Sequence, residues 1–375
     1  MSEPYRVPFI RPVFPTAAEL SEDFERIAAA NWYTNFGPEE RGFARAVGEY
    51  VGGGRTAVTF SNATVGLIGA LMASLGRGDG TRYVLVPSFT FAAGVHSIQW
   101  CGYKPLFIDI EAGSLQPSEP AARAAVGSHG AAIAGILLCN TFGIGNLQID
   151  TWEHLAQEAG LPLIIDSAAG FGSEYAPGRR VGTAGACEVF SFHATKPFAI
   201  GEGGAVVTAD EDLAARLRSF TNFGFDGASG AVAPGLNGKL QELSAAIGLR
   251  QLGRLDAALA SRQRTMRRYA DQLAGLVEFP WNLAASSVCF ASALFPTPEH
   301  RDRARTALTA AGVEVRAYYS PPVHRQPQFE SEEQWGSLAE TVRAGSGILS
   351  LPVHEAMSEA HEDVIVDTIV GVMTE

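Results

Sequence analysis

Short, continuous apolar runs alternate with helix-like segments from about residue 57, and this rhythm constrains the fold more than any other feature of the sequence. A small-residue helix is expected over 63–75, directly after the first run. Strands that are apolar on both sides are typical of a parallel sheet covered by helices on both faces. The sequence therefore predicts an α/β fold with a mainly parallel central sheet, whose strands contain AVTFS, YVLVP, KPLFIDI, AAIAGILLC and LPLIID.

The pattern changes after Val207. Leucines and an isoleucine recur at helical spacing from Leu240 to Leu259, which predicts one long connecting helix that begins near Lys239 and continues to residue 270. Strand-like SSVCFASALF, a helix over 298–311, the short strand-like VEVRAYY, ILSLP and a terminal helix follow. We expect two packed domains without a flexible tether: residues 1–250, with an N-terminal arm and a large domain, and residues 251–375, with the connecting helix and a smaller α+β domain.

Composition excludes several classes of function. The formal net charge of −12 has the wrong sign for neutralising a nucleic-acid backbone. The four cysteines are far apart and form no CxxC pair, and HExxH and EF-hand motifs are absent, so we expect neither a disulfide scaffold nor a metal site. No basic flank precedes an apolar stretch near residue 1, and no run of about 18 apolar residues occurs, so a cytoplasmic protein without membrane spans is expected.

Two segments carry residues suited to aldehyde chemistry. LPLIIDSAAGFGSEY ends a strand in Asp166, and SFHATKPFAIGEGGAVV places Lys196 between two turn-prone stretches. Ligands of open α/β sheets bind at the carboxyl ends of the strands, where both side chains could meet. Pyridoxal phosphate requires an amine for a Schiff base and an anion that keeps its ring nitrogen protonated, so these two residues suit that cofactor.

A phosphate site is predicted at the start of the 63–75 helix. In SNATVGLIGAL, Ala63 and Thr64 lie where a strand gives way to a helix, and free amides with the helix dipole favour an anion there. Ser191 could add a hydroxyl group. Phe91 in PSFTFAAG begins the next helix and could stack on the cofactor ring.

Each of these residues also has an ordinary interpretation. A lone lysine is usually an exposed surface charge, an aspartate at a strand end often caps a turn, and Phe91 could be core. His193, three residues before Lys196, could contact substrate and shuttle a proton, or could satisfy local hydrogen bonds. Taken in their order along the chain, the motifs around these residues favour the functional interpretation of Lys196, Asp166 and Phe91, and leave both interpretations of His193 open.

Eight motifs follow one another in order along the chain: NWYTNFGP, SNAT, PSFTF, IIDSAAGFGS, SFHATKPFAIGEGG, GLNGKLQELSAAIGLRQL, YYSPPVH and ILSLPVH. Through these motifs, and over nearly its whole length, the chain resembles the DegT/DnrJ/EryC1/StrS family of sugar aminotransferases, which are pyridoxal-phosphate enzymes of the aspartate-aminotransferase-like fold (fold type I). The resemblance implies Lys196 as the Schiff-base lysine, Asp166 as the partner of the pyridinium nitrogen and Phe91 as the ring-stacking residue. It further implies phosphate contacts from Ala63, Thr64, Ser191 and, from the neighbouring subunit of a homodimer with shared sites, Asn237.

HATKP with GEGG, and NGK before a helix, are closest to family members that aminate C4 of dTDP-4-keto-6-deoxyglucose with L-glutamate as donor. Amination at C3 and a non-catalytic pyridoxal-phosphate-binding regulator are the alternatives. A sugar dehydratase of the same fold is disfavoured because such enzymes have histidine in place of Lys196. A NAD-dependent dehydrogenase is disfavoured because the glycine fingerprint is absent. Ala169 departs from the family, which commonly has Gln or His there, so one polar cofactor contact is missing or replaced.

Overall fold

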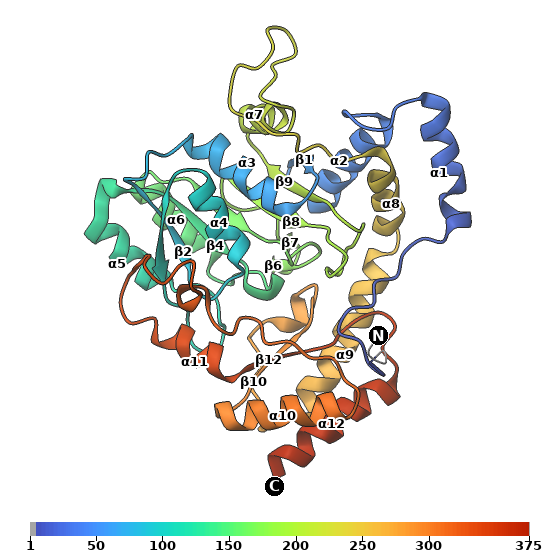
Figure 1. The fold of residues 1–375 in the computed structure, drawn as a ribbon, viewed down its shortest axis with the longest axis vertical. Helices are drawn as coiled ribbons and strands as arrows, with labels where there is room; N and C mark the ends of the chain where they lie inside the picture. Colours follow the sequence, from blue (N-terminus) through green and yellow to red (C-terminus); the bar gives the residue numbers. More distant parts are fainter. Residues whose placement is uncertain (1–4, 375) are drawn as a thin grey trace.

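The structure is a computed structural model that describes residues 5–374. An upper part built on a large sheet sits above a smaller lower part (Figure 1). None of the helices described is both long and apolar enough to cross a membrane. The lower part contains β10 (Ala291–Leu294), β12 (Ile348–Leu351), α10 (Pro298–Ala310) and α12 (Glu359–Thr374).

Eight strands form the large sheet, in the order β1-β9-β8-β5-β4-β2-β3-β11. Within it, β9 runs antiparallel to its neighbours β1 and β8, and every other pair is parallel. The predicted α/β fold with a mainly parallel sheet is confirmed. The strands are β1 (Thr56–Phe60), β2 (Tyr83–Pro87), β3 (Lys104–Ile108), β4 (Ile133–Cys139), β5 (Leu163–Asp166), β8 (Cys187–Ser191), β9 (Gly204–Thr208) and β11 (Glu333–Gln334).

Helices cover both faces of this sheet. Successive side chains of a strand point to opposite faces, so Leu137 and Leu138 of β4 enter different core clusters. Leu137 packs in the cluster that includes α3, α4 and α7, and Leu138 in the cluster that includes α2, α5 and α6. This double burial explains why the strands are continuously apolar. The helices are α2 (Pro38–Val51), α3 (Ala63–Leu75), α4 (Ala92–Trp100), α5 (Glu119–His129), α6 (Ile149–Ala159) and α7 (Glu211–Thr221).

Two helices, not one, follow α7 along the chain. α8 (Glu242–Leu252) and α9 (Leu255–Gln272) are separated by Gly253 and Arg254, so the prediction of a single connecting helix was wrong. The spacing of Leu252 and Leu255 still fits one helical face, and a short break between two helices leaves such a pattern unchanged.

The lower part differs from the predicted order in one segment. β10 and β12 form a two-stranded antiparallel sheet, as the strand-like SSVCFASALF and ILSLP suggested. VEVRAYY forms no strand; its regular pairing is limited to bridges from Val313 to Val7 and from Arg316 to Ser350. α11 (Ala339–Gly347) precedes β12, and the hairpin of β6 (Glu174–Ala176) and β7 (Arg179–Arg180) lies apart from both sheets.

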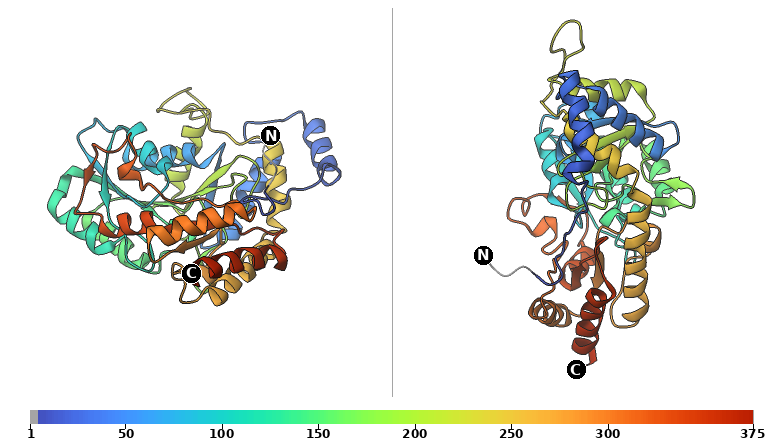
Figure 2. Two further views of the ribbon diagram at one scale, coloured as in Figure 1. Left: turned by 60° about the horizontal axis from the view of Figure 1, so that its bottom comes forward. Right: turned by 90° about the vertical axis from the view of Figure 1, so that its right-hand side faces the viewer.

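The beginning of the chain bridges the two parts. Val7 exchanges backbone hydrogen bonds with Gly312 and Glu314, and Val7 and Phe9 are buried in the core cluster of the lower part. Figure 2 (right) shows this segment beside the lower part before the chain turns upward into α1 (Ala17–Ala30). A division near residue 250, which falls inside α8, remains our proposal for the domain boundary.

Candidate active site

A cavity of about 700 Å³ opens where the carboxyl ends of the parallel strands face the lower part. Seven of the eight predicted site residues line this cavity: Ala63, Thr64, Phe91, Asp166, Ser191, His193 and Lys196. The eighth, Asn237, does not. A second cavity, of about 750 Å³ between α2 and β1, contains none of the predicted site residues.

Lys196 lies in the turn between β8 and β9. Its amide N–H donates to the His193 carbonyl oxygen at 2.9 Å, and its half-buried side chain lines the cavity. The chain has three lysines, and the other two, Lys104 and Lys239, do not line this cavity. The scarcity of lysine was visible in the sequence and limits the candidates for a Schiff-base lysine to three residues.

Asp166 is the last residue of β5 and pairs with Cys139 of β4 and Val189 of β8. Its side chain is buried, and Oδ1 accepts a hydrogen bond from the Ala168 N–H at 3.0 Å. Burial raises the pKa of this carboxyl group, while the Ala168 N–H and the charge of Lys196 favour its ionised form. A cation in the cavity beside Asp166 would favour the carboxylate further.

The start of α3, where the sequence predicts an anion site, lines the cavity. Asn62 caps the helix by accepting from the Val65 N–H at 2.9 Å, and the amides of Ala63 and Thr64 are in the first turn, where they have no intrahelical acceptor. Ser191, at the end of β8, lines the cavity with them. Gly204 makes this arrangement possible, because a Cβ there would lie 2.8 Å from the Ala63 nitrogen.

His193 is held by its neighbours in the same turn. Its Nδ1 accepts from the Thr195 N–H at 3.2 Å and lies 2.9 Å from the Thr195 hydroxyl oxygen. The neutral ring therefore carries its proton on Nε2, which lies 3.6 Å from Glu202 Oε1. His193 can therefore satisfy its local hydrogen bonds through Nδ1 and still carry a proton on Nε2 in the cavity that it lines.

An aromatic wall faces the strand ends. Phe91 lines the cavity and is 58% exposed. Its ring centre lies 6.5 Å from that of Tyr319, which stacks on Phe142 at 5.6 Å between ring centres and an interplanar angle of 17°. Sequence reasoning missed Tyr319, Tyr318 and Arg316, which all line the cavity. They belong to the irregular segment VEVRAYY, far along the chain from the sheet strands that carry the other site residues. Ala169 and, from the N-terminal arm, Phe9 and Ile10 also line the cavity.

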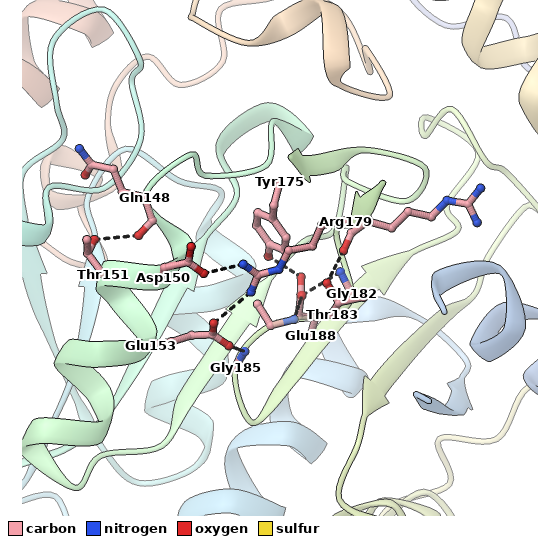
Figure 3. Close-up of polar contacts among 12 residues, drawn as sticks. Gln148, Asp150, Thr151, Glu153, Tyr175, Arg179, Gly182, Thr183, Gly185 and Glu188 are labelled. Atoms are coloured by element: carbon pink, nitrogen blue, oxygen red, sulfur yellow. Dashed lines mark hydrogen bonds and ion pairs between the residues drawn. The ribbon is translucent and has the colours of Figure 1, made fainter. Parts of the chain in front are cut away.

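A buried carboxylate supports the strand ends from behind. Glu188 of β8 accepts hydrogen bonds from Tyr175, Ser167 and the backbone of Gly182 and Ala184, at 2.7 to 2.9 Å. Burial raises the pKa of Glu188, and these four donors oppose that shift. Figure 3 shows part of this network beside an exposed one, in which Arg179 bridges Asp150 and Glu153.

Because Ser167 directly follows Asp166, the Glu188 network fixes the backbone from which Asp166 points. Asn140, at the end of β4, extends the network by donating to Ser167 and Tyr175. Its position after an apolar strand was visible in the sequence.

Asn237 lies elsewhere. It is exposed and forms an isolated bridge with Asn222. The next residue, Gly238, accepts a hydrogen bond from the Ser61 N–H at 2.6 Å, so the loop borders the anion site of its own chain without lining it.

Comparison with known proteins identifies this arrangement. Residues 16–370 match the DegT/DnrJ/EryC1/StrS aminotransferase family. The chain belongs to this family. Protein Rv3402c of Mycobacterium tuberculosis is 50% identical over 357 residues, which cover 94% of this chain and 87% of that protein. The dTDP-4-amino-4,6-dideoxy-D-glucose transaminase of Escherichia coli is 27% identical over 361 residues, 94% of this chain and 95% of its own.

A solved structure supports the same assignment. DesI, crystallised in the presence of its TDP-sugar product, has a TM-score of 0.90 and 33% identity, covering all of this chain and 94% of its own. The chain is therefore an aminotransferase of the DegT/DnrJ/EryC1/StrS family, with the fold of the pyridoxal-phosphate-dependent aminotransferases.

Proposed function

We propose that this aminotransferase acts on a nucleotide-linked keto sugar, dTDP-4-keto-6-deoxyglucose, which it converts to the 4-amino-4,6-dideoxy sugar with L-glutamate as amino donor. The observation that carries the proposal is the placement of Lys196, Asp166 and the start of α3 around one cavity. Its cofactor is pyridoxal 5′-phosphate, as in the family.

The residues present fit this cofactor. An anion at the amides of Ala63 and Thr64 gains hydrogen bonds and the favourable end of the helix dipole, and Ser191 adds a hydroxyl group. The buried carboxyl group of Asp166 would gain a positive partner, the protonated ring nitrogen, which offsets the cost of burying its negative charge. Phe91 and Lys196 complete the contacts, to the ring face and to the aldehyde. When bound, pyridoxal phosphate supplies an electrophilic aldehyde and a protonated ring that accepts electrons.

The residues of the chain itself would hold the cofactor and hold or transfer the protons of the reaction. Lys196 Nζ would hold the cofactor through its aldehyde and, when free, would act as the base that takes the proton from the donor's Cα. Asp166 keeps the ring nitrogen protonated by its charge. His193 Nε2 holds a second proton at the cavity, oriented by Thr195.

The position of amination is tested directly. Purified protein with pyridoxal phosphate, ¹⁵N-labelled L-glutamate and dTDP-4-keto-6-deoxyglucose is expected to give a product with nitrogen on C4, observed by NMR. The name of the Escherichia coli relative and the TDP-sugar product of DesI support this substrate. Nitrogen on C3 of a 3-keto substrate, or activity confined to small keto acids, would contradict the assignment.

We also propose that the active unit is a homodimer in which Asn237 completes the partner's phosphate site. Asn237 is exposed beside its own anion site, and apolar side chains that a partner would bury lie exposed nearby in sequence. The loop between α7 and α8 projects from the upper part (Figure 1). Its large exposed apolar residues are Phe223, Phe225, Val232 and Leu236.

Mixing two defective subunits tests this sharing. If Asn237 acts across the interface, a dimer of one Lys196→Ala and one Asn237→Ala subunit contains one site with neither lesion. Random mixing of equal amounts should then restore about one quarter of wild-type sites. The measurements are turnover and the affinity for pyridoxal phosphate, with a Lys196→Ala and Lys104→Ala mixture as control. A mixture no more active than its parents, or a fully active monomer, would exclude a shared site.

A further inference from the structure

The cavity has few cations for the anions that the reaction brings into it. Its lining contains one lysine, Lys196, one guanidinium, Arg316, and one imidazole, His193. Lys196 serves the cofactor aldehyde, and the start of α3 serves the cofactor phosphate. Arg316 is the permanently charged group that neither task uses.

The amino donor needs such a group. In an amino acid the α-carboxylate is attached to the same carbon as the reacting amine, so it enters the cavity with that amine. A carboxylate removed from water without a partner is costly, and an arginine is the partner best suited to it. The diphosphate of a sugar nucleotide is separated from the keto carbon by the sugar ring, so it can remain near the cavity mouth.

Arg316 is held in place with donors to spare. Nη2 donates to Glu314 Oε1 at 3.1 Å, and Nη1 donates to the Tyr318 hydroxyl at 3.0 Å. The guanidinium carbon lies 4.9 Å from the centre of the Phe9 ring. Glu314 is itself fixed by the Phe9 N–H, which donates to its other carboxylate oxygen at 2.9 Å. A guanidinium has five N–H donors, and three of those on Arg316 have no acceptor within the described chain.

We propose that Arg316 binds a carboxylate of the amino donor and thereby sets the enzyme's use of an amino acid in the first half of the reaction. The proposal rests on the proposed function, because it presumes that donor and keto sugar take turns in this cavity. Glu314, Tyr318 and Phe9 orient the guanidinium.

Separate measurements of the two half-reactions distinguish donor binding by Arg316 from a role in binding the keto sugar. Arg316→Gln is expected to lower kcat/KM for L-glutamate about 10- to 100-fold, measured as release of 2-oxoglutarate from the pyridoxal-phosphate form. Enzyme loaded directly with pyridoxamine phosphate needs no donor, so its kcat/KM for the keto sugar should stay within about twofold of wild type. Arg316→Lys keeps the positive charge but loses the planar pair of guanidinium donors, so its kcat/KM for L-glutamate should lie between those of wild type and Arg316→Gln.

Binding of glutarate gives a readout that needs no turnover. This dicarboxylate lacks an amine, and calorimetry on the holoenzyme should show its affinity reduced by a similar factor in Arg316→Gln. Arg305→Gln is the matched control, since Arg305 is also paired with a carboxylate, Asp302 at 3.2 Å, but lies outside the cavity.

Three results would overturn the proposal: equal losses in both halves, glutamate kinetics like those of Arg305→Gln, or unchanged glutarate affinity. If Arg316→Gln fails to fold, Arg316→Lys provides the same comparison. A wild-type enzyme that releases 2-oxoglutarate but aminates no nucleotide-linked keto sugar would refute the proposed substrate and leave the role of Arg316 to be decided by the first half alone.

Discussion

Replacement of Lys196 by alanine is expected to abolish turnover while the fold is retained. Under the proposed function, the change removes both the covalent anchor of the cofactor and the base that takes the donor's Cα proton, and a positioned base alone contributes about 10²–10⁴-fold. The fold should persist because Lys196 lies in a turn and is half-buried, and its structural hydrogen bond to His193 is made by the backbone N–H.

Turnover is measured with saturating pyridoxal phosphate and L-glutamate, and the fold by circular dichroism and thermal unfolding. Lys104→Ala is the matched control, because Lys104 is an exposed residue on β3 whose ammonium group lies 5.8 Å from the Tyr83 ring centre, away from the cavity. Borohydride reduction of the holoenzyme adds a direct test, since cofactor mass should appear on the peptide that contains Lys196 in wild type and on none in the variant. Retained turnover in Lys196→Ala would refute the catalytic assignment.

Much of the large sheet could be predicted because its strands are buried on both faces. Double burial leaves a continuous apolar run in the sequence, and the helix expected over 63–75 coincides with α3. The break at Gly253 could not be predicted, because apolar spacing continues across it. The segment around Arg316 is short and strand-like in sequence, but its backbone pairs only through isolated bridges at Val313 and Arg316, which no local pattern in the sequence specifies.

The site residues also fall into two groups, those that the sequence could predict and those that it could not. Asp166 and Ser191 end strands and Lys196 lies in the turn between two strands, so the topology of the sheet alone brings them to one edge. Arg316 and Tyr319 reach that edge only through the packing of the lower part on the upper one, and the arm residue Phe9 arrives from the opposite end of the chain. Such contacts depend on tertiary placement, which no local pattern in the sequence records.

Replacement of Asp166 by asparagine is expected to lower kcat about 10²–10³-fold, the usual loss when one preorganised electrostatic partner of a transition state is removed. An asparagine has nearly the same shape and can still accept the Ala168 N–H through Oδ1. It carries no charge, so it cannot favour the protonated ring nitrogen as a carboxylate does. Pyridoxal phosphate should still bind, through Lys196 and the start of α3.

Stability should change little or in the opposite direction from activity. Burial raises the pKa of Asp166 in the folded protein above its value in the unfolded chain, so the ionised side chain destabilises the cofactor-free fold at pH values above that raised pKa. A neutral asparagine removes this penalty, and the midpoint of thermal unfolding of the cofactor-free variant at neutral pH should not fall. A loss of activity without a loss of stability would therefore report chemistry, not folding.

A second aspartate near a strand end separates charge from capping. Asp210 follows β9 and caps α7 by accepting from the Asp212 and Leu213 N–H groups at 2.9 and 3.0 Å. Asparagine caps helices as well as aspartate does, so Asp210→Asn should keep near-normal turnover. If Asp166 only capped its turn, Asp166→Asn would behave in the same way, and near-normal rates in both variants would refute the pyridinium role. Severe loss in Asp166→Asn alone would show that Asp166 does more than cap its turn, as expected for a carboxylate that pairs with the ring nitrogen.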